Sequence, residues 1–180
     1  MIGGRRRESN EYGAEQRMEK VFIIGIVASG KTTLAKRLSE KIKVPWYELD
    51  CIVHHQTAAG RYKRTAEEQM EVINNIDMNG SWIFEGTDRE SYRCLLEMAD
   101  TIIFLDTPLW KRKLRIFTRF LKQKIGIEPC HYKSDLKMLN RMYQWTRDFE
   151  SKRESFEARL LPHKSKVIRL TDSRSLHFVT

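Results

Sequence analysis

The chain has 180 residues, 41% of them hydrophobic and 32% charged, which is enough for one domain with a buried core and excludes wholesale disorder. No apolar run approaches the roughly 20 residues that span a bilayer, and the first residues lack the apolar stretch of a secretory signal, so we expect a cytosolic protein without a membrane partner. The net charge of +9, from 33 basic and 24 acidic residues, favours anionic partners such as nucleotide phosphates or a nucleic acid.

The three cysteines, Cys51, Cys94 and Cys130, are far apart, odd in number and form no CxxC pair. This pattern argues against a disulfide framework and against a zinc ribbon. The adjacent pairs His54-His55 and Cys130-His131 also lack the ligand spacing of a structural metal site. We interpret both pairs as loop residues.

The domain is expected to cover residues 18–180, because segment 1–17 is polar, has no hydrophobic period and is expected to form a flexible tail. Within the domain, short apolar runs alternate with segments of helical period. The expected strands cover residues 20–24, 45–49, 82–84, 101–105 and 167–170. The expected helices cover residues 31–43, 65–78, 92–98, 109–124, 134–160 and a short stretch at the end of the chain. This alternation predicts an α/β protein, a three-layer α/β/α sandwich with a parallel sheet covered on both faces.

Residues 25–32, GIVASGKT, match the phosphate-binding pattern GxxxxGK[ST] at each fixed position, between an expected strand and an expected helix. The two glycines allow a tight turn whose backbone amides can face phosphate oxygens, and the helix N-terminus adds its positive end. Lys31 is expected to reach the β- and γ-phosphates, and Thr32 to bind Mg²⁺. The motif therefore predicts a nucleoside triphosphate site. Its expected contact residues are Gly25, Ala28, Ser29, Gly30, Lys31, Thr32 and Thr33.

Acidic residues follow three of the expected strands, at the sheet edge where open parallel sheets bind their ligands. Asp106 follows the most apolar strand, where it could hold Mg²⁺ through water or cap the next helix. Asp50 follows the second strand, where it could orient or deprotonate an acceptor hydroxyl, with Glu48 on the same side of the pleat. A solvated loop carboxylate is the alternative for both. Glu85 ends the third strand.

Positive charge is concentrated between Thr107 and Lys166, where there are 16 Lys and Arg residues and six Asp and Glu. The expected helix 109–124 has seven basic residues and no acid. Arg112, Arg115 and Arg119 are spaced by three and four residues, which places them along one helical face. Arginines that enter a closed site can neutralise a transferring phosphoryl group or stack on adenine. The alternative interpretation of these basic residues is a solvated helix face.

These features together resemble the adenylate-kinase-like P-loop kinases, over most of the chain from about Lys20. The resemblance rests on GIVASGKTT at residues 25–33 and on Leu49-Asp50. It continues with LDTP at 105–108 and with the RxxxR pattern that begins at Arg115.

The resemblance implies roles for several of these residues. In such enzymes the first arginine of RxxxR, here Arg115, stacks on adenine, and the second, here Arg119, contacts phosphates at the start of a mobile lid. The lid would cover residues of about 122–135. Asp50 is similar in position to the aspartate that binds the acceptor hydroxyl in shikimate-kinase-like enzymes. The resemblance also implies a five-stranded sheet in the order 2-3-1-4-5.

A narrower resemblance is to the bacterial group labelled DNA topology modulation protein, or FlaR-related protein. It is carried by WYELD at 46–50, SWIFEGT at 81–87, ADTIIFLDTP at 99–108 and the helix around Trp145. The chain departs from that group where an acceptor or lid contact would lie. These departures are EGTD at 85–88 in place of Asp-Gly-Asn-Tyr, Leu95 in place of an arginine, and a lid without the usual Arg/Gly-rich sequence.

The sequence therefore predicts an ATP- and Mg²⁺-dependent kinase that acts on a small-molecule or nucleotide acceptor. Lys31, Asp50 and Arg119 are the expected catalytic residues, Thr32 and Asp106 the expected metal ligands, and Arg115 a further nucleotide contact. Arg89 or Arg93 could bind an anionic group of the acceptor, or lie on the surface. Two alternatives are an ATP-switched regulator that binds nucleic acid, and a nucleoside triphosphatase without a small acceptor.

Overall fold

The computed structural model describes residues 18–57, 60–127 and 135–175. The expected tail over residues 1–17, the pair Cys130-His131 and half of the expected lid, residues 128–134, lie outside the described residues. Of the short helix expected after the last strand, residues 171–175 form turns, and the remainder also lies outside the described residues.

Five parallel strands form the central sheet, as the alternating pattern predicted. They are β1 (Lys20–Ile24), β2 (Trp46–Glu48), β5 (Trp82–Gly86), β6 (Thr101–Leu105) and β7 (Val167–Leu170). Their order is β2-β5-β1-β6-β7, which is 2-3-1-4-5 when only these strands are counted. Ile24 at the end of β1 lies opposite Gly86 on one side and Phe104 on the other, so the carboxyl ends of the three central strands meet.

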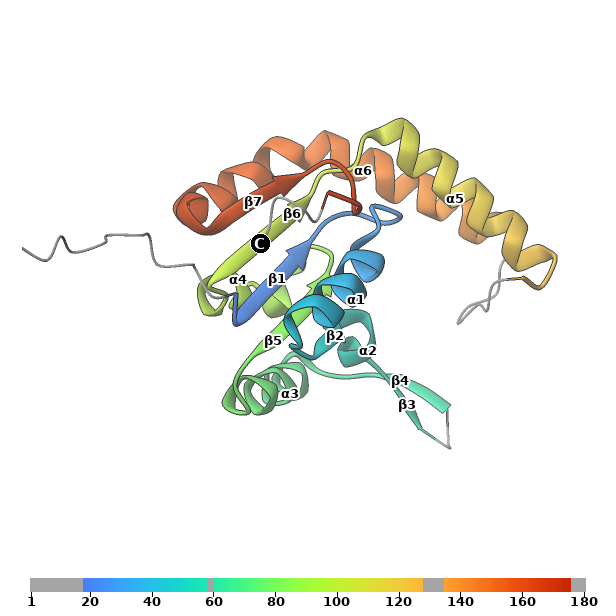
Figure 1. The fold of residues 1–180 in the computed structure, drawn as a ribbon. Helices are drawn as coiled ribbons and strands as arrows, with labels where there is room; N and C mark the ends of the chain where they lie inside the picture. Colours follow the sequence, from blue (N-terminus) through green and yellow to red (C-terminus); the bar gives the residue numbers. More distant parts are fainter. Residues whose placement is uncertain (1–17, 58–59, 128–134, 176–180) are drawn as a thin grey trace, which may run out of the picture.

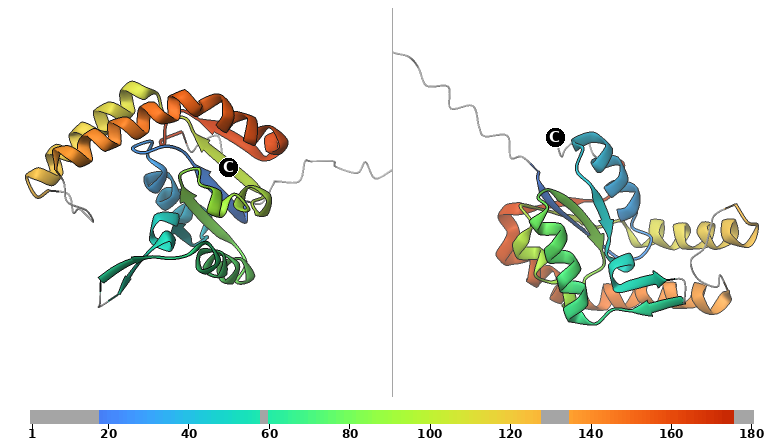
Figure 2. Two further views of the ribbon diagram at one scale, coloured as in Figure 1. Left: turned by 180° about the vertical axis from the view of Figure 1, so that it is seen from behind. Right: turned by 90° about the horizontal axis from the view of Figure 1, so that it is seen from below.

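Helices cover both faces of this sheet, because the side chains of each buried strand alternate between the faces. Val21 and Ile23 of β1 face α1 (Lys31–Ile42), which packs Leu34 and Leu38 against them. The opposite face, with Phe22, is covered mainly by three helices. These are α3 (Ala66–Met78), α4 (Leu95–Met98) and the C-terminal part of α6 (Leu136–Leu160). Figure 2 shows α1 and α3 on opposite sides of the sheet, which confirms the three-layer sandwich.

A short helix and a hairpin between β2 and α3 were not predicted. The expected strand 45–49 ends at Glu48, and α2 (Leu49–Val53) follows it. The chain then forms β3 (His54–Thr57) and β4 (Gly60–Lys63), an antiparallel pair outside the main sheet. The hairpin is polar and exposed, so it lacks the apolar alternation that marks a strand in sequence. The interpretation of His54 and His55 as loop residues was therefore wrong.

A capping box begins α3. The Thr65 hydroxyl accepts a hydrogen bond from the Glu68 amide at 3.2 Å, and the Glu68 carboxylate accepts one from the Thr65 amide at 2.7 Å. Such a cap stabilises a helix by about 1 kcal/mol. It fixes the point at which the chain leaves the hairpin and returns to the core.

Two long helices, α5 (Leu109–Lys124) and α6, lie side by side and project together beyond the sheet (Figure 1). α6 is followed by the short 3₁₀ helix η2 (Leu161–Lys166), which leads into β7. Another 3₁₀ helix, η1 (Glu90–Tyr92), precedes α4. No helix in the described part of the chain is long and apolar enough to cross a membrane.

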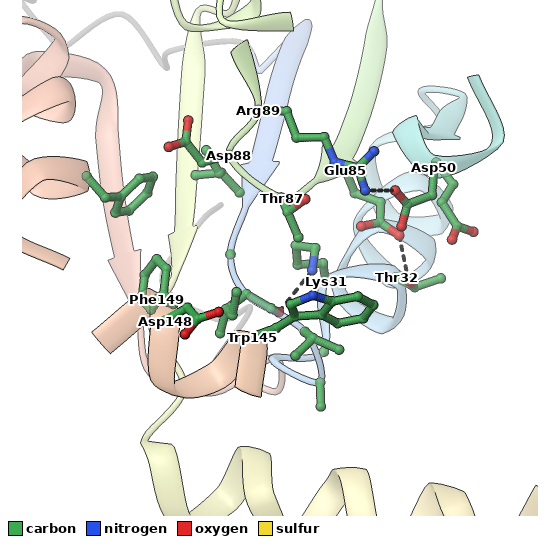
Figure 3. Close-up of a pocket in the computed structure, with 18 of the residues that line it drawn as sticks. Lys31, Thr32, Asp50, Glu85, Thr87, Asp88, Arg89, Trp145, Asp148 and Phe149 are labelled. Carbon is green, nitrogen blue, oxygen red and sulfur yellow. Dashed lines mark hydrogen bonds and ion pairs between the residues drawn. The ribbon is translucent and has the colours of Figure 1, made fainter. Parts of the chain in front are cut away.

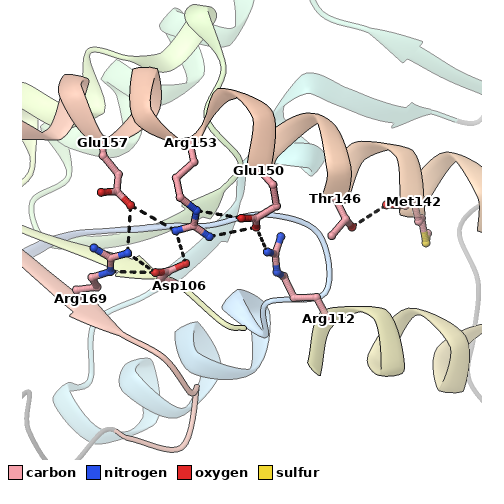
Figure 4. A network of polar contacts seen from close by, with 8 residues as sticks. All are labelled: Asp106, Arg112, Met142, Thr146, Glu150, Arg153, Glu157 and Arg169. Atoms are coloured by element: carbon pink, nitrogen blue, oxygen red, sulfur yellow. Dashed lines mark hydrogen bonds and ion pairs between the residues drawn. The ribbon is translucent and has the colours of Figure 1, made fainter. Parts of the chain in front are cut away.

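A buried arginine joins the two long helices. Arg112 of α5 is 1% exposed and forms an ion pair with Glu150 of α6. Arg153 also binds Glu150, through its Nε at 3.1 Å, and extends the contact toward Asp106 (Figure 4). The Arg112 Nε and Nη1 atoms have no hydrogen-bond partner among the described residues, so Glu150 is the carboxylate that compensates this buried charge.

We predict that Glu150→Ala lowers the free energy of unfolding by about 3 kcal/mol, because it leaves the buried Arg112 guanidinium without its carboxylate. Arg112→Met should cost less, since it removes the buried charge itself and leaves Glu150 bound to Arg153. Urea denaturation of the wild type and both variants measures this difference. A larger loss for Arg112→Met than for Glu150→Ala would contradict this account.

Candidate functional site

The loop between β1 and α1 depends on two glycines. At Gly25, an added Cβ would lie 2.9 Å from the backbone oxygen of Leu105, so the loop passes too close to β6 for a side chain. At Gly30, φ is +102°, and an added Cβ would lie 3.0 Å from the Ser173 hydroxyl oxygen. Both positions therefore favour glycine for a structural reason, as the motif predicted.

Two side chains hold the loop from outside by binding the carbonyl of Ser29. The buried Thr107 hydroxyl donates to it at 2.8 Å, and Nη1 of Arg115 donates at 2.6 Å. In a trans peptide the N–H points opposite to the C=O, so the Gly30 amide is directed away from these two groups. Gly30 is among the residues that line the large cavity beside the loop. The bracing therefore fixes the peptide that joins Ser29 to Gly30 at the edge of that cavity.

Lys31 begins α1 and lies at the centre of the site. Its Nζ donates to the backbone oxygen of Ile26 at 3.0 Å, so the side chain folds back over the loop. Burial lowers the pKa of Lys31, while the nearby carboxylates of Glu85 and Asp50 act to raise it. An anion bound in the loop would also favour the charged lysine.

Glu85 is the carboxylate that contacts the threonine of the motif. Thr32 Oγ1 donates to Glu85 Oε1 at 2.5 Å, and Glu85 is 3% exposed at the end of β5. Burial raises the pKa of Glu85, against the opposing effects of Lys31 and the Thr32 hydrogen bond. Two hard oxygen donors thus lie together beside the loop, which suits Mg²⁺. Among the described residues, no three His, Cys, Asp or Glu are grouped so as to hold a metal by themselves.

Asp106 is bound by two arginines and does not lie at the Mg²⁺ site that its position at a strand end suggested. Arg153 Nη1 donates to Oδ1 at 2.8 Å, and Arg169 Nε donates to Oδ2 at 2.9 Å. Burial alone would raise the pKa of Asp106, but the hydrogen bonds from Arg169 and Arg153 hold it below its usual value. Asp106 is not among the residues that line the cavity, and Figure 4 shows it within an ionic network. The structure thus places Glu85, and not Asp106, next to Thr32.

The cavity beside the loop has a volume of about 560 Å³. Lys31 lies between its two walls (Figure 3). One wall carries Glu48 and Asp50, together with the segment after β5. Asp50, in the first turn of α2, binds Arg89 through Oδ1 at 2.9 Å, and both side chains are partly exposed. Asp50 and the phosphate-binding loop are thus brought into one cavity, as expected.

The other wall is one face of α6, which the sequence analysis did not identify. It contributes Trp145, Asp148, Phe149, Lys152, Phe156 and Arg159. These residues repeat at intervals of three and four, so they form one helical stripe. Its mixture of aromatic and charged side chains was the available signal for a site-facing helix. Arg159 forms an ion pair with Asp88, which joins this wall to the segment after β5.

The spacing of three arginines predicted that they lie along one face of α5, but their side chains contact three different parts of the protein. Arg112 is buried against Glu150, Arg115 braces the carbonyl of Ser29, and Arg119 lines the cavity. Sequence reasoning also missed the turn after β7. Asp172 lies 3.9 Å from Arg115 and 3.3 Å from Lys111, and so helps to hold α5 against the loop.

Comparisons with known proteins found no matching family model and no matching curated protein. Solved structures do match. Shikimate kinase from Acinetobacter baumannii in complex with shikimate has a TM-score of 0.51 at 13% identity, covering 80% of this chain and 81% of that chain. Shikimate kinase from Aquifex aeolicus vf5 has a TM-score of 0.40 at 21% identity over 73% and 80%. A sugar kinase from Janibacter sp. HTCC2649 has a TM-score of 0.40 at 18% identity over 71% and 94%. The first of these likenesses shows that the chain has the P-loop kinase fold.

The raised pKa of Glu85 predicts that the stability difference between wild type and Glu85→Gln changes with pH. The folded state holds the Glu85 proton more tightly than the unfolded state. The free energy of unfolding of the wild type therefore falls as pH rises from the unfolded carboxyl pKa, about 4.3, through the raised folded value. The variant lacks this proton, so its stability relative to wild type should increase across that window.

Urea denaturation of both proteins at several pH values between about 4 and 7 measures this change. If the stability of Glu85→Gln relative to wild type stayed constant or decreased as pH rises, Glu85 would not titrate as its burial requires.

Proposed function

We propose that this protein is an ATP- and Mg²⁺-dependent phosphotransferase whose acceptor is a small molecule or nucleotide with a hydroxyl or phosphate oxygen. The observation that carries the proposal is that one cavity contains both the phosphate-binding loop and Asp50. A volume of about 560 Å³ lies in the usual range for ligand sites. We expect the reaction to use cytosolic ATP. The more specific assignment to the DNA topology modulation group is also a proposal.

In this proposal the loop and Lys31 bind the triphosphate. The Gly30 amide and the N-terminus of α1 face phosphate oxygens, and the ammonium group leaves the Ile26 carbonyl to bind the β- and γ-phosphates. Thr32 and Glu85 supply the protein oxygens for Mg²⁺, Glu85 taking the place that we had expected for Asp106. When bound, the ion neutralises charge on the transferring phosphoryl group. The nucleotide phosphates and water would complete its ligands.

The acceptor oxygen attacks the γ-phosphorus in line with the leaving ADP. The new P–O bond forms as the bond from γ-phosphorus to the β,γ-bridging oxygen breaks. Asp50 orients an acceptor hydroxyl and receives its proton, after its carboxylate exchanges Arg89 for the acceptor. Arg119, which lines the cavity, is placed to neutralise the transferring group.

Arg115 has a different proposed role from the adenine stacking that the resemblance implied. Its guanidinium binds the carbonyls of Ser29, at 2.6 Å, and Ala28, at 3.4 Å. Stacking on adenine would require it to give up these bonds. We therefore propose that Arg115 contributes to nucleotide binding by holding the loop in place.

The nucleic-acid-binding alternative rests on the charge between Thr107 and Lys166. Several arginines of this region are paired with carboxylates, including Arg112, Arg153 and Arg159. The pairing reduces the charge available to a phosphate backbone. A binding constant for duplex DNA that does not change with salt concentration would remove this alternative, because phosphate contacts release counterions.

We predict that Lys31→Ala abolishes ATP binding and turnover while the fold is kept. The variant loses the ammonium group that binds the β- and γ-phosphates, and the hydrogen bond that it also loses, to the Ile26 carbonyl, lies within the loop. ADP release from Mg-ATP, measured against a panel of nucleoside monophosphates, nucleosides, hydroxy acids and sugars, tests this. An acceptor-dependent signal that survives in Lys31→Ala would come from a contaminating kinase and would count against the proposal.

We predict that Asp50→Asn binds ATP normally but transfers phosphate at least about 100-fold more slowly, because a positioned acid or base is worth that factor or more. The matched control is Glu90→Gln, which neutralises an exposed carboxylate that pairs only with its neighbour Arg93 among the described residues. The control should retain the wild-type rate. Normal transfer by Asp50→Asn would refute the role given to Asp50.

A further inference from the structure

The outer face of α5 carries a continuous apolar stripe in solvent. Trp110, Leu114, Phe117 and Leu121 are 64%, 56%, 45% and 44% exposed, and we call these four residues the α5 stripe. They are separated by four, three and four residues, so they lie on one side of the helix. From Trp110 to Leu121 the stripe extends roughly 17 Å along α5, so it is a ridge and not an isolated side chain.

The stripe faces away from α6 and the sheet. The buried residues Arg112 and Ile116 lie on the opposite side of α5, where the helix packs on α6. Arg115, which reaches the phosphate-binding loop, also leaves the helix on a side away from the stripe. The core and the kinase-like site therefore do not use these apolar side chains. Ile125 and Ile127, 67% and 69% exposed, extend the apolar surface beyond the end of the helix.

Lysines border the stripe on both sides. At about 100° per residue, Lys113 and Lys124 lie beside the stripe on one flank, and Lys122 lies farther round the helix on the other. The whole helix has seven basic residues and no acidic one. An occupant of this face must therefore accept large apolar side chains in the middle and provide negative charge on both margins.

We propose that the α5 stripe docks this protein on an anionic lipid surface. A helix with aromatic and aliphatic residues on one side and lysines beside them is the pattern that lies in the plane of a bilayer interface. The stripe is a helix ridge that lines neither the cavity beside the loop nor the small cavity between α5 and α6, so a rigid partner would need a matching groove. A lipid interface deforms around a ridge and offers headgroup charge along its whole length. Docking in this plane requires no membrane-crossing helix.

A second copy of the chain fits this face poorly. Each copy would bring the lysines beside its own stripe to the contact, and α5 has no acidic residue, so two copies repel at the face. Nucleic acid also fits poorly, because the centre of the face is apolar and phosphates would meet only its margins.

The test uses the full chain with sedimented vesicles of phosphatidylcholine alone, or of phosphatidylcholine with about 30% phosphatidylserine, at about 0.1 M salt. We expect at least about tenfold tighter binding to the anionic vesicles, lost as salt rises, with a blue shift of tryptophan emission as Trp110 leaves water.

The decisive variant is Leu114→Glu with Leu121→Glu, which should weaken vesicle binding by about tenfold or more. Its matched control is Met78→Glu with Leu161→Glu, which makes the same change of charge at two exposed positions elsewhere, 77% and 66% exposed. The control should lose less than about threefold, as the general change in charge allows. Lys113→Gln with Lys122→Gln should weaken binding to anionic vesicles and leave weak binding to phosphatidylcholine unchanged. Far-UV circular dichroism and the urea denaturation midpoint verify that all variants are folded.

Several results would overturn the proposal. These are an absence of anionic vesicle binding, equal losses in the stripe variant and its control, or a wild-type dimer that Leu114→Glu with Leu121→Glu dissociates. Stripe-dependent binding to polyglutamate with no vesicle binding would assign the surface to an acidic protein partner. None of these readouts requires phosphotransfer, so the outcome is independent of the proposed function.

Discussion

The site depends on two hydrogen bonds that side chains donate to one backbone carbonyl, that of Ser29. Thr107, at the end of β6, and Arg115, on α5, both donate to the oxygen of Ser29. Their bonds set the orientation of the peptide that carries the Gly30 amide, and Gly30 packs against Ser173 after β7. Three segments far apart in the chain thus hold a loop that has few contacts of its own. A preorganised loop is what anion binding by backbone amides requires.

The position of α5 in turn depends on ion pairs with α6. Arg112 is bound to Glu150, Glu150 to Arg153, and Arg153 to Asp106 at the end of β6. Arg169 of β7 completes this network on the other oxygen of Asp106. The network therefore connects the sheet edge to the helix that braces the loop. It also positions α6, whose other side forms the aromatic and charged wall of the cavity.

The two sides of α5 face different environments. Its inner side carries arginines that contact the loop, the cavity and α6, while its outer side carries the apolar stripe between lysines. A helix buried on one side usually has a polar outer side, and an exposed ridge of large apolar residues marks an interaction surface. Docking through this ridge would leave the cavity on another side of the helix, so surface binding and phosphotransfer do not compete for the same residues.

The sequence by itself determined the features that depend on neighbours in the chain. Short apolar runs separated by helical periods were sufficient for the five strands and the main helices, and the spacing of Gly25, Gly30, Lys31 and Thr32 was sufficient for the phosphate-binding loop. The capping box of α3 is equally local, because its bonds join Thr65 to Glu68. The strand order came from resemblance and not from periodicity.

Only the tertiary structure decided which of several equivalent residues meet. Glu48, Glu85 and Asp106 all end parallel strands, and periodicity cannot show that Glu85 lies beside Thr32 while Asp106 is bound by two arginines. Arg112, Arg115 and Arg119 share one face of a helix, yet their partners come from α6, the loop and the cavity. The polar hairpin has no apolar pattern to reveal it, and the α6 stripe resembles a core face until the cavity beside it is known. In each case the partner is distant in sequence, and its identity follows from how the helices pack on the sheet edge.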